Sequence, residues 1–153
     1  FYYFTDALYS QPGSKYRALD EELTLMGRYR AELEVVMIDR DRIPPSLWDA
    51  LTQGLGISSY PALIASPTSL GVEEVKLETA SYTPPRGARY IKVEAGILLD
   101  EVLGDRDRLR EFLNRLFDAA REGDLEAAFR RLKLEAYLKR GLEVLKEIIR
   151  VVR

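Results

Sequence analysis

The sequence predicts an α/β fold in which helices flank a central mixed sheet. Short, β-prone apolar runs alternate with segments whose apolar residues recur at helical spacing. The expected elements follow in the order strand, helix, strand, helix, strand, strand, helix, and a helical extension closes the chain. We therefore divide the 153 residues into a main α/β domain over residues 1–122 and a helical extension over residues 123–153.

The expected strands are short apolar runs that end at turn-forming or charged residues. The first three contain few polar residues, which is typical of strands covered on both faces. The fourth alternates apolar and charged residues, which is typical of a half-exposed strand. The five expected strands are residues 1–5, 33–38, 62–65, 73–80 and 89–94.

Three helices are expected in the main domain. The first and third carry apolar residues three and four positions apart, which predicts one buried face for each. The second begins at two prolines, which the first turn of a helix tolerates, and it stops at a glycine. These helices cover residues 15–31, 44–53 and 105–121.

The extension is expected to be helical from Gly123 to its end, either as one helix or as two helices divided at Gly141. Its last part has a heptad seam, which is formed by Leu138, Leu142, Leu145, Ile149 and Val152. An isolated helix of two heptads is marginal in water. The seam must therefore pack against something, which is either the chain's own domain or a partner such as a second copy.

Composition excludes several classes of chemistry. Because the chain has no cysteine and no histidine, it cannot form an intrachain disulfide, use a thiol nucleophile or build a thiolate or imidazole metal site. A serine nucleophile that needs a histidine base is excluded for the same reason. The net charge of −2 argues against nucleic acid as a partner, and neither a cofactor nor a metal is indicated.

The sequence also bears on location. It has no run of about 20 apolar residues that could span a membrane and no signal-peptide pattern, so we expect a cytoplasmic protein without a membrane partner. Because the chain begins at Phe1, directly on a strand-like run, we expect the native amino terminus to lie upstream, which leaves an upstream targeting segment or second domain open. Dense charges and a preference for arginine over lysine suit a thermophile, although genomic base composition explains them as readily.

Three stretches lie in the order and spacing of motifs from a known fold family. Gln11-Pro12-Gly13-Ser14-Lys15 separates the first expected strand from the first helix. Residues 35–41 form the second strand and its acidic end, and residues 56–64 lead into the third strand through Tyr60-Pro61. Together these stretches resemble the thioredoxin-like superfamily over residues 1–122.

The resemblance implies a redox-inactive member of that family. Gln11 and Ser14 stand where the family's two cysteines would be, and Pro61 stands at its cis-proline. The family's tryptophan before the cysteine motif and its buried aspartate beneath the cysteines are not evident, since Trp48 lies elsewhere in the chain. Both losses fit a site without thiol chemistry.

The resemblance also implies a binding mode that needs no cysteine. In the family, the backbone of the residue before the cis-proline, here Tyr60, pairs with an extended peptide in a form of β-augmentation. We therefore expect a non-catalytic protein-binding or assembly module, and a homodimer through the terminal helix is a further option. The expected groove residues are Gln11, Pro12, Gly13, Ser14, Tyr60 and Pro61.

Two other functions stay open on the sequence alone. The fold could serve an enzyme of the glutathione-transferase type, which would activate a small thiol or peroxide through Ser14, Ser10 or Tyr9. The chain could also be the inactive half of a longer disulfide oxidoreductase whose other half carries the cysteines. Ser14 has a simpler explanation as well, because serine favours the N-cap position of a helix.

Overall fold

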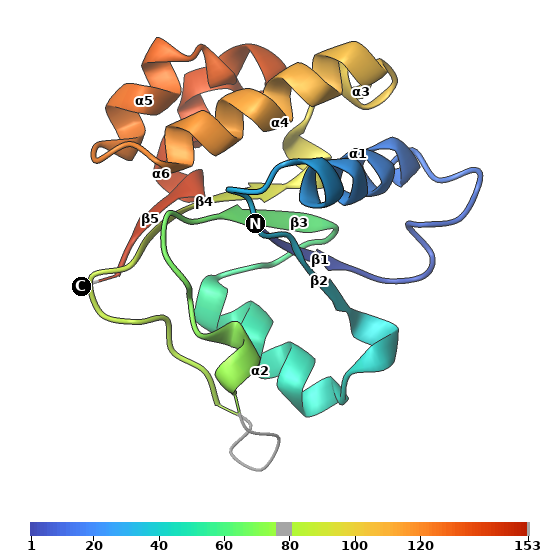
Figure 1. The fold of residues 1–153 in the computed structure, drawn as a ribbon, viewed down its shortest axis with the longest axis vertical. Helices are drawn as coiled ribbons and strands as arrows, with labels where there is room; N and C mark the ends of the chain where they lie inside the picture. The colour runs from blue at the N-terminus through green and yellow to red at the C-terminus, as the bar shows by residue number, and fades with distance from the viewer. Residues whose placement is uncertain (76–80, 153) are drawn as a thin grey trace.

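A five-stranded mixed sheet forms the centre of the protein, in a computed structural model that describes residues 1–75 and 81–152 (Figure 1). The strands are β1 Tyr2–Thr5, β2 Val36–Asp39, β3 Ala62–Ala65, β4 Arg89–Glu94 and β5 Ile149–Val151. They lie side by side in the order β2-β1-β3-β4-β5. β1 is parallel to β2, whereas the β1–β3, β3–β4 and β4–β5 pairs are antiparallel. The chain therefore has the α/β fold with a mixed sheet that its pattern predicts.

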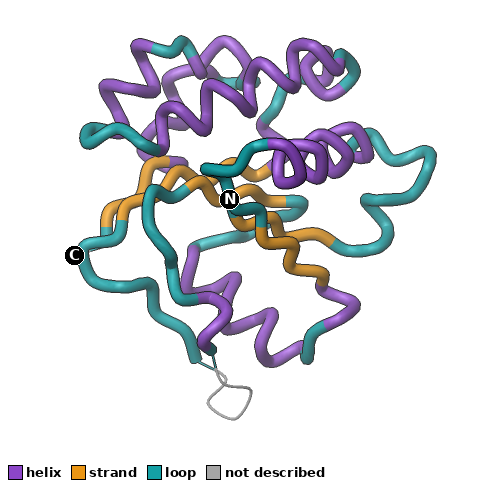
Figure 2. The backbone as a smooth tube through the Cα atoms, in the orientation of Figure 1, coloured by secondary structure: helices purple, strands orange, loops and turns teal. Residues whose placement is uncertain are grey.

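Helices cover both faces of this sheet (Figure 2). The α-helices are α1 Arg17–Tyr29, α2 Pro45–Leu55, α3 Asp100–Leu103, α4 Arg106–Ala120, α5 Leu125–Arg131 and α6 Leu145–Ile148. Short 3-10 helices are formed by Arg40–Arg42, Val72–Glu74, Ala95–Ile97, Leu134–Tyr137 and Gly141–Val144. In Figure 1, α1 and α4 lie on one face of the sheet and α2 lies on the other.

The sheet divides the apolar side chains into two cores, because successive residues of a strand point to opposite faces. Tyr3 and Leu63 belong to the larger core, which is shared with α1, α4 and the extension. Phe4 and Ile64 point the other way and pack with α2, where Trp48 is buried. β1 and β3 are therefore buried on both faces, as their apolar composition predicts.

Two strand predictions need correction. The prediction of a fourth strand over residues 73–80 is wrong in its first part, because Val72–Glu74 form a 3-10 helix. The rest of that prediction, residues 76–80, lies outside the described residues. β2 is less buried than its composition predicts. It is the outermost strand next to β1, so Met37 is 43% exposed.

The prediction that the chain stays helical to its end is wrong, because Ile149–Val151 form a strand, whereas Gly141 does interrupt the helical run. Gly141 adopts a left-handed φ of 56°, and the chain turns there into a 3-10 helix. α6 then lasts four residues, after which β5 pairs with β4. Leu145 of the seam is buried in the larger core, whereas Leu142 is 44% exposed. The extension thus packs on its own domain and adds a strand to its sheet.

Two distant segments meet at one end of the sheet. Phe4 near the end of β1 lies opposite Ala62 at the start of β3. The loop of residues 6–16 that follows β1 and the segment of residues 56–61 that precedes β3 therefore start from neighbouring positions. The loop projects from this end of the sheet before it enters α1 (Figure 1).

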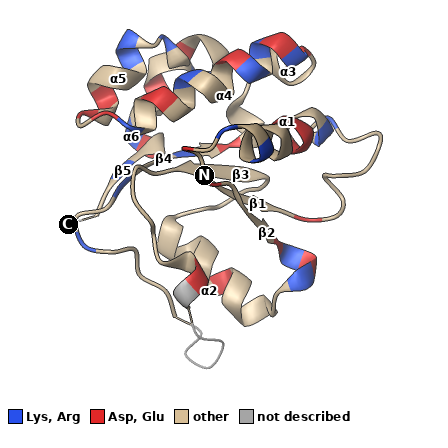
Figure 3. Cartoon of the chain, viewed as in Figure 1, with Lys and Arg blue, Asp and Glu red and all other residues tan. Residues whose placement is uncertain are grey.

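Charged residues of both signs are intermixed along the helices that cover one face of the sheet (Figure 3). Several are paired one turn apart, as in the ion pairs of Arg115 with Glu111 and of Arg130 with Glu126. Such exposed pairs contribute little to stability, but they leave the helical layer without a surface of one sign.

Candidate functional site

The loop after β1 contains the turn that the sequence predicts at Gln11–Ser14. The Gln11 carbonyl accepts hydrogen bonds from the amides of Gly13 at 3.1 Å and Ser14 at 3.0 Å. Proline and glycine at the centre of this turn suit its backbone geometry. The Arg17 guanidinium at the start of α1 donates to the Ser10 carbonyl at 2.6 Å. The loop is thus tied to α1 while Gln11, Pro12 and Gly13 stay exposed.

An open hollow of about 580 Å³ lies against this turn. It is lined by Leu8, Tyr9, Gln11, Pro12, Gly13, Ser14, Lys15 and Tyr16. Leu8 is 63% exposed and adds apolar surface to this hollow. Four of the six groove residues predicted from the sequence therefore line one cavity.

A row of aromatic rings connects this hollow to the segment before β3. Tyr16 meets Tyr9 edge to face with ring centroids 5.6 Å apart, and Tyr9 meets Tyr60 in the same way at 6.1 Å. Tyr60 in turn meets Trp48 at 5.2 Å. Edge-to-face packing is favourable beyond the area that it buries, so the row holds its members in place.

Arg40 covers one end of the aromatic row. Its guanidinium lies over the rings of Tyr60 and Trp48, at 5.3 and 5.9 Å from the centroids. It also donates a hydrogen bond to the Tyr60 hydroxyl. Cation–π contacts of this kind are worth about 0.5–1 kcal/mol at exposed sites. They place a positive charge beside the predicted groove.

Tyr60 and Pro61 take different positions in the site. The peptide bond between them is cis. Pro61 is buried, and its carbonyl accepts a hydrogen bond from the Ala95 amide at 2.8 Å. Tyr60 is half-buried, and within the described residues neither its amide nor its carbonyl has a backbone hydrogen-bond partner. Neither Tyr60 nor Pro61 lines the hollow, and Tyr60 is connected to it only through its ring contact with Tyr9.

A buried polar network fixes the segment that carries Tyr60. The Lys92 ammonium donates to the Gly56 carbonyl at 2.5 Å and pairs with the Glu94 carboxylate at 3.1 Å. Glu94 also accepts hydrogen bonds from the hydroxyls of Ser58, at 3.1 Å, and of Ser59. Burial opposes its ionisation, but the bonds from Ser59 and Lys92 outweigh burial and hold the pKa of Glu94 below its ordinary value.

The structure offers no activated nucleophile at Ser14 or Tyr9 among the described residues. Ser14 lies before α1, whose N-cap residue is Tyr16. The Ser14 hydroxyl accepts a hydrogen bond from the Tyr16 amide at 3.2 Å. The N-cap position expected for Ser14 is therefore wrong by two residues. Burial, with a smaller effect from the Asp6 carboxylate, raises the pKa of Tyr9 above its ordinary value, so its phenol stays neutral at physiological pH.

The site contains residues that the sequence analysis missed. Leu8, Tyr16 and Arg40 were not assigned to it, and Trp48 was placed elsewhere because it is far from the turn in sequence. The clustering of tyrosines at positions 9 and 16 around a proline–glycine turn was a usable signal for two of the rings. The contacts of Arg40 and Trp48 with Tyr60 depend on tertiary packing and have no local signal.

Comparisons with protein-family models, with curated proteins and with solved structures give no match. The function must therefore be inferred from the geometry of the chain's own residues.

Within residues 1–75 and 81–152, each helix is too short or too polar to cross a bilayer. Over the same ranges, no group of three or more acidic side chains is arranged to hold a metal ion.

Proposed function

We propose that this chain is a redox-inactive, thioredoxin-like binding module that takes an extended segment of another protein without chemical conversion. The observation that carries the proposal is the backbone of Tyr60, which has no backbone hydrogen-bond partner within the described residues and whose ring contacts Tyr9 of an exposed apolar and aromatic hollow. An unpaired amide and carbonyl can add a strand of a partner by β-augmentation, and neighbouring hollows then select its side chains.

The order of the elements supports the thioredoxin-like part of the proposal. The resemblance requires that the turn of Gln11–Ser14 precede α1 and that Pro61 precede β3. Both segments lie at the same end of the sheet, because β1 ends beside the start of β3. The turn carries no thiol, so binding there is reversible and non-covalent.

The hollow suggests how a partner segment would be held. Leu8 and the rings of Tyr9 and Tyr16 offer an apolar surface for one or two partner side chains. Full burial of a leucine-sized side chain is worth about 1.5–3 kcal/mol. Because the partner must lose conformational freedom when it docks, we expect micromolar affinity at best.

The test begins with selection of displayed random peptides against the folded chain. The peptide selected most strongly is then synthesised and titrated calorimetrically against wild type and Leu8→Ser. Leu142→Ser is the matched control, because Leu142 is another exposed leucine and lies in the extension. Leu8→Ser should weaken binding about tenfold, from the loss of about 1.4 kcal/mol of apolar contact, while Leu142→Ser should bind as wild type does.

A backbone measurement separates β-augmentation from non-specific apolar contact. The amide resonance of Tyr60 should move downfield and gain protection from hydrogen exchange when the peptide binds. Equal affinity for both leucine variants, together with an unchanged Tyr60 amide, would refute the proposed site.

The hollow also favours one second candidate, an enzyme of the glutathione-transferase type. Its volume of about 580 Å³ lies within the range of small-molecule sites, and Tyr9, Ser14 and Lys15 all line it. A neutral Tyr9 phenol could donate a hydrogen bond to a thiol. Glutathione at millimolar concentration should then raise the unfolding temperature of wild type but not of Tyr9→Phe; no shift for wild type rejects this candidate.

A further inference from the structure

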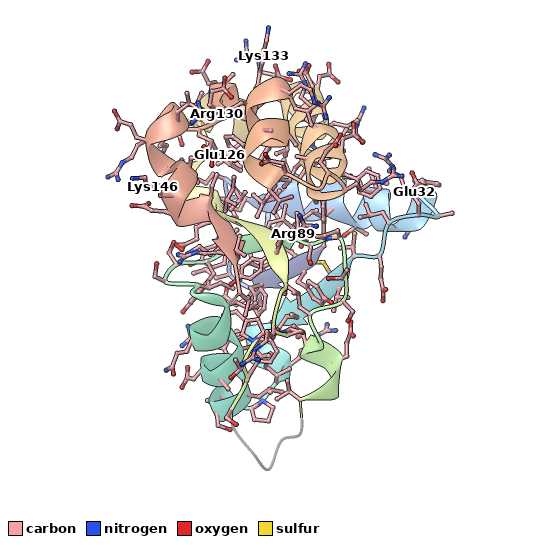
Figure 4. The ribbon with its side chains drawn as sticks, turned by 90° about the vertical axis from the view of Figure 1, so that its left-hand side faces the viewer. Glu32, Arg89, Glu126, Arg130, Lys133 and Lys146 are labelled. Atoms are coloured by element: carbon pink, nitrogen blue, oxygen red, sulfur yellow. The ribbon has the colours of Figure 1, made fainter. Side chains whose placement is uncertain are left out.

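A second cavity, of about 350 Å³, lies between the C-terminal end of α2, β4 and the end of the extension. Figure 4 shows α6 and β5 running down from the helical layer past this end of α2. The side chains that decide its chemistry are Lys92, Glu94, Ile97, Glu147, Ile148 and Arg150. The hollow at the Gln11–Ser14 turn shares none of these residues.

Two of the four charges in this cavity already satisfy each other. Lys92 is 5% exposed and pairs with Glu94, while its ammonium also donates to the Gly56 carbonyl. Glu94 is further bonded to Ser58 and Ser59. A ligand would therefore meet the Lys92–Glu94 pair as a neutral wall.

Among the residues that the structure describes, the other two charges, on Glu147 and Arg150, have no such partner. The Arg150 Nε–H is buried and has no hydrogen-bond partner within the described residues. Over the same residues, neither Arg150 nor Glu147 takes part in an ion pair, although both line the cavity. A buried donor without an acceptor is costly, so an anionic group held against the Arg150 side chain would be stabilising.

We propose that this cavity binds a free α-amino acid. Arg150 lines the cavity, and its forked guanidinium matches the geometry of a carboxylate. The carboxylate of Glu147 would receive the ligand's ammonium group. Ile97 and Ile148 would contact a short apolar side chain, and the volume of about 350 Å³ accommodates an amino acid of the size of valine or leucine.

The test is a calorimetric titration with L-leucine, L-valine and two half-analogues of leucine. 4-Methylpentanoate keeps the carboxylate and lacks the amine, whereas 3-methylbutylamine keeps the amine and lacks the carboxylate. We expect a Kd of about 1 mM or tighter for at least one of the two amino acids, and binding at least about tenfold weaker for both half-analogues. Failure of leucine and valine to bind at about 10 mM would overturn the proposal, as would equal binding of 4-methylpentanoate and leucine.

Variants then assign the two ends of the ligand. Arg150→Gln and Glu147→Gln should each weaken binding about tenfold. Lys146→Gln is the matched control, because Lys146 is an exposed neighbour on α6 that does not line the cavity (Figure 4). Arg150→Lys, which keeps the charge and loses the fork, should also bind more weakly, and wild-type affinity in both Arg150 variants would refute the assignment.

A measurement on the wild type covers the case in which an Arg150 variant fails to fold. The Nε–H resonance of Arg150, in a ¹⁵N-edited spectrum, should shift on addition of the bound amino acid. An unchanged resonance at saturation would overturn the role of Arg150. Because the peptide test reads the Tyr60 amide and Leu8, its result is independent of this one.

Discussion

Replacing Glu22 by glutamine should destabilise the protein by weakening the hydrogen bonds that join α1 to α4. Glu22 lies on α1, and its side chain is 2% exposed. It accepts three hydrogen bonds from α4: one from Arg106 at 3.2 Å and two from Arg110 at 3.1 Å. A glutamine keeps the shape but presents an NH2 group to one of the guanidinium donors.

The loss of stability depends on which charged group remains without its partner. Both arginine side chains are about half exposed, so water can solvate them when the carboxylate is lost. We therefore expect Glu22→Gln to lower the free energy of unfolding by about 2 kcal/mol, within the range for hydrogen bonds to charged groups. The double variant Arg106→Gln/Arg110→Gln should cost more, about 3–5 kcal/mol, because it leaves the buried carboxylate without its cations.

The assay is urea unfolding of the three proteins at several pH values. Hydrogen bonds from Arg110 and Arg106 hold the pKa of Glu22 below its ordinary value of 4.5, against the effect of burial. Because the pKa is lowered on folding, the stabilisation is present at neutral pH and declines as the pH falls below about 4.5 and through the folded pKa. At pH 7, Glu22→Gln should melt about 4–8 °C below wild type.

Two results would refute this reasoning. One is a double arginine variant that is more stable than Glu22→Gln, since the buried carboxylate is then not the costly group. The other is a gap between wild type and Glu22→Gln that does not narrow in acid. Arg106 also pairs with the exposed Glu21, a contact worth too little to reverse the order of the two variants.

Three further substitutions test the packing, one turn and one helix cap by chemical denaturation. Phe112→Ala, in the larger core against Tyr137, should cost about 3–5 kcal/mol, and a loss below 1 kcal/mol would mean that the site collapses without a cavity. Gly56→Ala should cost about 1 kcal/mol because φ is 73° there, whereas Gly96→Ala, in open space, should be neutral. Asp124→Ala should cost about 1 kcal/mol by removing the cap on the Ala127 amide, and equal stability would show that water replaces it.

The parts of the fold that could be predicted are those with a local signal. β1 is apolar except for Thr5, β3 is apolar throughout, and α4 repeats its apolar residues at helical spacing, so their burial could be predicted from local sequence alone. The end of the chain could not be predicted in this way. Ile149 enters a strand because Ile91 lies opposite it, and that pairing joins positions far apart in sequence.

In the candidate site, too, only the residues with a local signal could be predicted from the sequence. Proline and glycine mark the turn at Gln11–Ser14 from their own backbone preferences, and the structure has a turn there. The position of Trp48 beside Tyr60 depends on how α2 packs under the sheet, which no neighbouring residue encodes. Arg40 enters the site for the same reason.

The two outermost strands also govern how the protein behaves at high concentration. β2 has four residues and runs directly into the charged segment Arg40–Arg42, while β5 has three residues and carries Arg150 at its centre. Long, flat, apolar edges recruit further chains into growing fibres, whereas short and charged ones resist such recruitment. The sheet can therefore leave both flanks open to solvent and still resist edge-to-edge aggregation.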